Sequence, residues 1–190
     1  MTRVSTLGLV FVAVLVGGLS VPAAAQKGPC AMEGVEPGMS SDDVVAALGR
    51  PSIQMKNDSP TGQGTITTMG WSSPDAVVEV DTNDKGQVVR VYRSQKSGAL
   101  KGPFGVRLGK DDLRQAVRRI GEESIAVGPA RCTGNKVQVP FSATCSDDGT
   151  KFTFLLDVPT GTIACDAAPA KEGLIDSMGR TLIREAVVER

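Results

Sequence analysis

The stretch that decides the fold is "GMSSDDVVAALGRP", residues 38–51. Ser40 suits the N-cap of a helix, because its hydroxyl can accept a hydrogen bond from an amide in the first turn. Gly49 suits the position just after the helix, since glycine adopts left-handed backbone without strain, and Pro51 prevents the helix from continuing. The stretch therefore predicts a short helix that begins after Ser40 and ends before Gly49.

The side chains inside this stretch also have structural roles. Met39 and Val44 are spaced as a hydrophobic staple across the N-cap. Asp42 and Asp43 fall in the first turn, where the helix dipole favours negative charge, and adjacent helical residues point about 100° apart. That divergence suits neither a catalytic carboxylate pair nor a metal site. The expected buried stripe consists of Val44, Ala47 and Leu48.

A second stretch, "VRLGKDDLRQAVRRIG" at 106–121, repeats the arrangement. Gly109 takes the N-cap position, and Leu108 and Leu113 are spaced as the staple. Asp111 and Asp112 then fall in the first turn, 69 residues after the first aspartate pair. The predicted stripe of this helix consists of Leu113, Ala116, Val117 and Ile120.

Each predicted helix is followed by three strand-like runs. Their β-branched and alternating residues are typical of antiparallel sheets with one buried face. The runs are 64–71, 76–80 and 87–93 in the first half, and 136–141, 151–157 and 161–165 in the second. We expect an α+β fold of two tandem helix–antiparallel-meander units, although two ordinary α+β halves would look alike by chance.

The expected organisation has five parts. They are a signal peptide at 1–25, a first repeat at 26–97, a linker at 98–104, a second repeat at 105–167 and a C-terminal amphipathic helix at 168–190. In the last part, Leu174, Met178, Leu182 and Ala186 recur every four residues. That stripe packs on the chain's own sheet or on a partner, and the sequence leaves both open.

The first 25 residues resemble a cleaved bacterial signal peptide. Arg3 precedes an apolar run at 7–19, and the small residues 23–25 suit signal peptidase, which makes Gln26 the expected mature N-terminus. An uncleaved anchor is the alternative. Cys30 does not directly follow the apolar run, so we expect no lipoprotein. These features predict a periplasmic or secreted protein without a membrane span after cleavage.

Four cysteines, Cys30, Cys132, Cys145 and Cys165, are expected to form two disulfides in an exported chain. Three pairings are possible. Cys132 and Cys145 bracket the strand-like run 136–141, which favours a local pair between them and leaves Cys30 to join Cys165. No C-x-x-C spacing indicates zinc.

The composition excludes several functions. The chain has 21 basic and 21 acidic residues, so no basic excess points to nucleic acid. It has no histidine, which removes Ser–His and Cys–His catalytic schemes and the commonest transition-metal ligand. We therefore expect no enzyme, no catalytic residue, no cofactor and no metal. An unfamiliar enzyme using carboxylates and lysine is a remote alternative.

Aromatic side chains give the candidate binding residues. Trp71 and Tyr92 are of the types that anchor protein interfaces, and Arg90 shares a strand face with Tyr92. Trp71 has the alternative of burial in the first sheet. Tyr92 lies on the less buried face of its strand, so it is the better surface candidate.

The first half resembles the SmpA/OmlA (BamE) family of outer-membrane assembly lipoproteins. The resemblance lies in the helix stretch, in Trp71 and in the paired strands at 76–91, and its matched positions are Gly38, Met39, Ser40, Val44, Leu48, Gly49 and Pro51. The same fold in tandem, with disulfides, is that of the β-lactamase inhibitory proteins. The second half matches only loosely, the cysteine spacings differ from those of the inhibitors, and we expect no lipid anchor in this chain although the assembly lipoproteins have one.

The resemblance implies two helix–sheet layers side by side with a concave sheet face. It also implies a non-catalytic role in binding an envelope or extracellular protein, as an assembly or scaffolding factor. A secreted inhibitor of a hydrolase is the alternative. No catalytic or contact residue of either family transfers to this chain.

Overall fold

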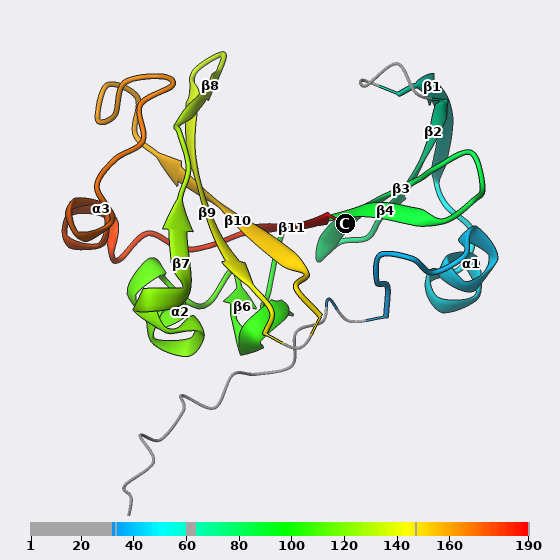
Figure 1. Cartoon of the computed structure of the whole chain (residues 1–190), viewed down its shortest axis with the longest axis horizontal. Coiled ribbons are helices and arrows are strands. Elements are labelled where there is room, and N and C mark those ends of the chain that lie inside the picture. Colours follow the sequence, from blue (N-terminus) through cyan, green and yellow to red (C-terminus); the bar gives the residue numbers. More distant parts are fainter. Residues whose placement is uncertain (1–31, 33, 60–63, 147, 190) are drawn as a thin grey trace, which may run out of the picture.

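The computed structural model describes residues 32, 34–59, 64–146 and 148–189. In this part of the chain, nine strands form one antiparallel sheet in the order β1-β2-β3-β4-β11-β10-β9-β7, with β8 paired to β9. The sheet curves upward at both outer ends, and α1 and α2 lie on its convex side (Figure 1). The mixed α+β fold predicted from the sequence is confirmed. The predicted signal peptide and Cys30 lie outside the described residues.

The elements run in chain order as follows. The first half contains α1 (Ser41–Leu48), β1 (Ile53–Asp58), β2 (Thr65–Ser72), β3 (Ala76–Thr82) and β4 (Val88–Gln95). Next come β5 (Leu100–Lys101), the 3-10 turn η1 (Pro103–Gly105) and β6 (Arg107–Leu108). The remainder contains α2 (Leu113–Ile120), η2 (Glu122–Ser124), β7 (Ile125–Val127), β8 (Arg131–Thr133), β9 (Lys136–Thr144), β10 (Lys151–Val158), α3 (Lys171–Met178) and β11 (Glu185–Glu189).

The α1 helix has the predicted ends. The Ser40 hydroxyl accepts the amide of Asp43 at 3.2 Å, and the amide of Gly49 bonds the Val45 carbonyl. Gly49 has a φ of 80°, a left-handed value that favours glycine. Of the predicted stripe Val44 is buried and Leu48 packs partly buried against the core, whereas the prediction is wrong for Ala47, which is exposed.

The α2 helix begins later than predicted. Its N-cap is Asp112 rather than Gly109, because Asp112 and Gln115 form a reciprocal capping box. The Asp112 carboxylate accepts the Gln115 amide at 2.8 Å, and the Gln115 side chain accepts the Asp112 amide at 3.0 Å. Asp111 therefore lies before the helix and not in its first turn. The predicted stripe is confirmed, and all four of its residues are buried.

The C-terminal segment is only partly helical. The predicted helix is confirmed over α3, and Leu174 packs into the chain's own core. The helical prediction is wrong beyond α3, because 179–184 form a turn and an irregular segment and 185–189 form β11 between β4 and β10. Pairing on both sides decides this, because Ala186 and Val188 enter the core as alternate residues of a strand.

The central strands join the two halves. β11 pairs with β4 on one side and with β10 on the other, so both halves share one sheet. Outward from this junction, β4, β3, β2 and β1 succeed each other on one side, and β11, β10, β9 and β7 on the other. The strand predicted at 161–165 is wrong, because these residues form turns. The tandem origin of the halves and their limits stay predictions.

The segment between the halves is folded onto the core. β5 pairs with β6 as a short hairpin, and Phe104 at its tip is 1% exposed. The Phe104 ring meets the Phe152 ring edge to face, with centroids 5.4 Å apart. This contact fixes the residues predicted as a linker against the sheet of the second half.

The structure contains a disulfide between Cys132 and Cys165, so both favoured pairs, Cys132–Cys145 and Cys30–Cys165, are wrong. The chain after β10 returns beside β8, where the amide of Ala130 bonds the Ala167 carbonyl at 2.8 Å. This return brings Cys165 next to Cys132. Cys145 is also disulfide-bonded. Within the described ranges, no helix is long and apolar enough to cross a membrane.

Candidate binding face

The concave face of the sheet is the side opposite α1 and α2 (Figure 1). Register places six residues in one row across it, namely Ile53, Gly70, Glu79, Tyr92, Val187 and Thr153. Their chain neighbours Val80, Val91 and Val188 belong to the core, and strand side chains alternate between faces. The row therefore belongs to the concave face, which no helix covers in the part of the chain that the structure describes.

Tyr92 lies at the centre of this row. It is opposite Glu79 on β3 and Val187 on β11, so both halves of the sheet contribute to its surroundings. Burial is the main factor that raises the pKa of Tyr92 to about 12, and the nearby carboxylates of Glu185 and Glu79 add to the increase. The phenol is thus protonated and half-buried, and the sequence prediction that it faces the less buried side is confirmed.

Arg90 lies beside Tyr92 on the same face. Its guanidinium carbon is 5.8 Å from the centroid of the Tyr92 ring, a cation–π distance. It also pairs with Asp81 at 3.1 Å and with Glu189 at 3.6 Å. These contacts join β3, β4 and β11, so Arg90 stabilises the pairing of the two halves of the sheet and packs against the Tyr92 ring.

Trp71 lies on the opposite side of the sheet from Tyr92. Its indole N–H donates to the Gly49 carbonyl at 3.0 Å, which attaches β2 to the end of α1. The ring is partly buried and lines a hollow of ≈ 480 Å³ between α1 and β5, together with Leu48 and Leu100. The three predicted binding residues therefore divide between two faces, with Arg90 and Tyr92 together and Trp71 apart.

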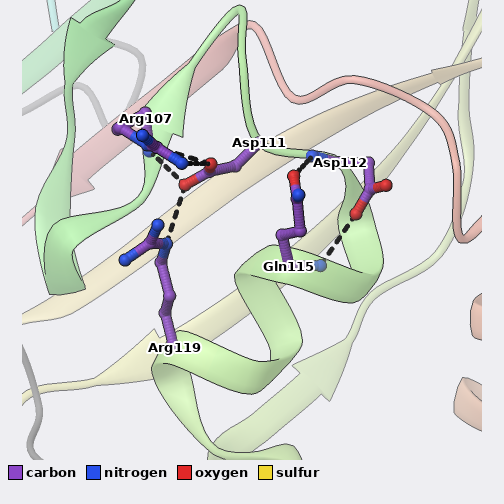
Figure 2. A network of polar contacts seen from close by, with 5 residues as sticks. All are labelled: Arg107, Asp111, Asp112, Gln115 and Arg119. Atoms are coloured by element: carbon purple, nitrogen blue, oxygen red, sulfur yellow. Dashed lines mark hydrogen bonds and ion pairs between the residues drawn. The ribbon is translucent and has the colours of Figure 1, made fainter.

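A buried polar network surrounds Asp111 at the start of α2 (Figure 2). The side chain of Asp111 is 0% exposed and accepts four hydrogen bonds. Arg107 donates its backbone amide at 2.9 Å, its Nε at 3.1 Å and its Nη2 at 2.8 Å, and Arg119 donates its Nε at 2.8 Å.

Two opposing effects act on the pKa of Asp111 in this network, namely its burial and its contacts with two arginines. Burial disfavours the ionised Asp111, but hydrogen bonds from Arg107 and the charge of Arg119 outweigh it and hold the pKa of that carboxyl below its usual value. The Asp111 carbonyl also accepts the Ile183 amide at 3.1 Å. The network thus attaches the β5–β6 hairpin, α2 and the segment before β11 to one another, which is an architectural role.

The described residues contain no candidate metal site. Among the residues that the structure describes, no three acidic or cysteine side chains gather into a group that could hold a metal ion. The two disulfide-bonded cysteines at 132 and 165 have no free thiol to act as a nucleophile. The expectation of a protein without metal or catalysis stays a prediction.

Sequence reasoning missed the neighbours of Tyr92 and the Asp111 network. Glu185 and Val187 reach Tyr92 because β11 inserts beside β4, and this insertion was hidden by the helical pattern of the tail. The sequence pattern predicts Asp111 inside the first turn of the helix. In the structure the helix begins at Leu113, after its N-cap Asp112, so Asp111 lies outside it. The S/T/D-x-x-E/Q spacing of Asp112 and Gln115 is the signal that identifies the true N-cap.

Comparison with known proteins shows only distant structural likeness. No protein-family profile matches the chain, and no curated protein matches it in sequence. A cysteine-rich secretory protein from Staphylococcus aureus is similar, with a TM-score of 0.47 and 9% identity over 86% of this chain and 48% of that chain. The chain thus spans about half the length of that protein.

A second similar structure is a protein from Streptococcus mutans described as a proposed β-lactamase inhibitor. Its TM-score is 0.31, with 13% identity over 70% of this chain and 85% of that chain. A protein described in this way is thus among the distant structural neighbours of this chain, and the predicted resemblance to the β-lactamase inhibitory proteins goes no further than that. The resemblance to the BamE family stays a prediction.

Proposed function

We propose that this chain is an exported, non-catalytic protein that binds another envelope or extracellular protein on its concave face. The observation that carries the proposal is the uneven covering of the sheet. Helices pack on the convex side, whereas the concave side carries Tyr92 and its row across both halves without a covering helix among the described residues.

The chemistry of this face suits a protein partner. Half-buried tyrosine and arginine side chains are enriched among the residues that dominate binding energy at interfaces. Ile53 and Met55 lie on β1 at the outer end of the same face and are 57% and 53% exposed. A face with apolar positions and a few fixed charges, supported by a continuous sheet, can bind without much loss of conformational entropy.

Export is the setting that best suits the described chemistry. The Cys132–Cys165 disulfide persists in oxidising compartments such as the periplasm or the extracellular space. The predicted signal peptide adds support from sequence. Two kinds of partner fit this proposal, namely an assembly factor of the envelope and a hydrolase that the chain inhibits. An inhibition panel of secreted hydrolases separates the two.

Site-specific photocrosslinking tests the binding face. A photoreactive residue at Thr153, which lies in the Tyr92 row, should trap a partner in envelope extract, and one at Ala46 on the exposed side of α1 is the matched control. The trapped protein is then purified and titrated against the unlabelled chain. We expect Tyr92→Ala to weaken that binding at least tenfold.

Two results would contradict the proposal. One is an adduct that forms at position 46 and not at position 153. The other is a purified partner whose affinity is unchanged by both Tyr92→Ala and Arg90→Ala.

A further inference from the structure

The Tyr92 row has a gap at Gly70. This residue lies between Ile53 on β1 and Glu79 on β3, in the middle of β2. Because glycine has no side chain, a hollow of ≈ 150 Å³ opens over it on the concave face. We call this space the Gly70 hollow, and Ile53, Met55, Val77 and Glu79 are among the residues that line it.

The backbone does not require glycine at this position. A Cβ atom built on Gly70 would meet only the Cβ of Ile53, at 3.9 Å, which is ordinary contact. Its φ lies outside the left-handed range. Glycine in the interior of a strand lowers stability and often marks a place where another molecule approaches closely. The space above Gly70 is thus the feature that distinguishes it from other strand residues.

The walls of the hollow combine apolar and ionised groups. Ile53 and Met55 provide exposed apolar surface, and Val77 adds to it from β3. Glu79 provides a carboxylate. Among the described residues, none forms a hydrogen bond or an ion pair with it. Other carboxylates of the face are engaged, since Asp81 accepts from Thr68 at 2.7 Å and pairs with Arg90.

The size of the hollow limits its occupant. Sites for drug-sized ligands measure about 300–1,000 Å³, so ≈ 150 Å³ suits a single side chain. A long apolar stem that ends in one positive charge matches apolar walls beside one carboxylate. Lysine has this form, whereas the planar fork of arginine is suited to bidentate pairing with a carboxylate.

We propose that the Gly70 hollow receives a lysine side chain from the protein that binds the concave face. The stem lies over Gly70 between Ile53 and Val77, and the ammonium meets Glu79. This inference rests on the proposed function, because the lysine belongs to the bound partner. It names the chemistry of one contact on that face.

The test uses small probes, so that no partner has to be known. The probe is hexylamine, which has an apolar stem and one ammonium, and hexanol and hexanoate have the same stem without a positive charge. Each is titrated into the ¹⁵N-labelled chain, and amide shifts are followed by NMR. We expect shifts centred on Gly70, Met55 and Glu79, with hexylamine binding about tenfold more tightly than hexanol.

Two variants locate the binding, and a third controls for charge. Gly70→Val fills the hollow and should abolish the shifts, and its strand geometry is tolerated because the backbone is not left-handed. Glu79→Gln keeps the shape and should weaken hexylamine about tenfold while leaving hexanol unchanged. Glu122→Gln, in the η2 turn near α2, removes an equal charge elsewhere and should change nothing.

The inference is overturned if hexanol binds as tightly as hexylamine, if the shifts map elsewhere, or if they report self-association that depends on protein concentration. Its failure is distinct from failure of the proposed function. A protein trapped at Thr153 with no selective hexylamine binding overturns only the lysine contact. Selective hexylamine binding without any trapped protein overturns the protein-binding role, and with it the assignment of the occupant to a partner's lysine, and leaves a site for an alkylammonium group.

Discussion

Replacing Asp111 with asparagine tests how much the buried network contributes to stability. Asparagine keeps the size of the side chain and one acceptor oxygen, but it removes the negative charge between Arg107 and Arg119. The arginines contact different oxygens of the carboxylate, at 2.8 Å in both cases. An amide NH₂ group would face one of these guanidinium groups, donor against donor.

The expected loss of stability depends on the burial of Asp111 and on the exposure of its two arginine partners. Breaking a fully buried ion pair by removing one partner costs about 3–5 kcal/mol. Here the two arginines are 40% and 39% exposed, so water can solvate their freed N–H groups. We therefore expect a loss of about 2–3 kcal/mol in the free energy of unfolding.

The pH dependence gives a second, independent signature. The pKa of Asp111 is lowered in the folded chain, so its stabilisation is present above the unfolded pKa of about 3.9 and is lost as the pH falls through the folded pKa. The difference between parent and Asp111→Asn should be constant from about pH 5 to 8 and should shrink below about pH 4.

Urea unfolding with the disulfides intact measures both quantities. Asp58→Asn is the matched control, because Asp58 lies on the exposed edge strand β1, and its effect should stay within about 0.5 kcal/mol. If Asp111→Asn costs no more than this control, or if its cost does not shrink in acid, the charge of Asp111 does not stabilise the fold.

Three further predictions concern the aromatic centre, the disulfide and the first helix. Tyr92 is the chain's only tyrosine, so the phenolate absorbance should rise with a midpoint near pH 12 and not 10, and Glu79→Gln should lower that midpoint. Because this pKa is raised by folding, the stability that Tyr92 contributes is present below about pH 10 and is lost as the pH rises through 12. Cys132→Ser opens a bridge between residues 33 apart and should cost about 3–4 kcal/mol by thermal unfolding, and adding Cys165→Ser should cost no more. Ser40→Ala removes the α1 cap and should cost about 1 kcal/mol in urea unfolding.

Local signals were sufficient to predict α1. Ser40 and Gly49 mark its ends through contacts with residues three or four positions away, and the structure confirms both. The stripe of α2 was equally predictable, since helical spacing depends on the helix itself. Its start was wrong because two plausible caps lie three residues apart, and only the Gln115 side chain distinguishes Asp112 from Gly109.

The tail shows where local pattern fails. Residues 171–190 have apolar positions every four residues, yet 185–189 pair with strands of both halves. Its short run of Ala186, Val187 and Val188 suits either conformation, and long-range hydrogen bonding to β4 and β10 decides between them. β1 was missed for the opposite reason, because its six residues are all exposed and carry no buried alternation.

The binding face was predictable one strand at a time and no further. Alternation along 87–93 predicts that Tyr92 and Arg90 lie on the less buried side, and in the structure Val91 between them belongs to the core. The neighbours that define their chemistry come from register between strands far apart in the chain, such as Glu79 and Glu185. The Gly70 hollow likewise exists only because Ile53 and Glu79 flank that residue on adjacent strands.

The position of β11 sets the order in which the molecule can assemble. It follows every other strand in the chain, yet it lies in the middle of the sheet. As the chain emerges from a ribosome or a translocation channel, β4 and β10 each have an unpaired edge until 185–189 arrive. Such edges pair readily with other chains, so the slowest and most aggregation-prone interval of folding should be the wait for this strand. A chaperone that shields β4 and β10 during that interval would protect both halves at once.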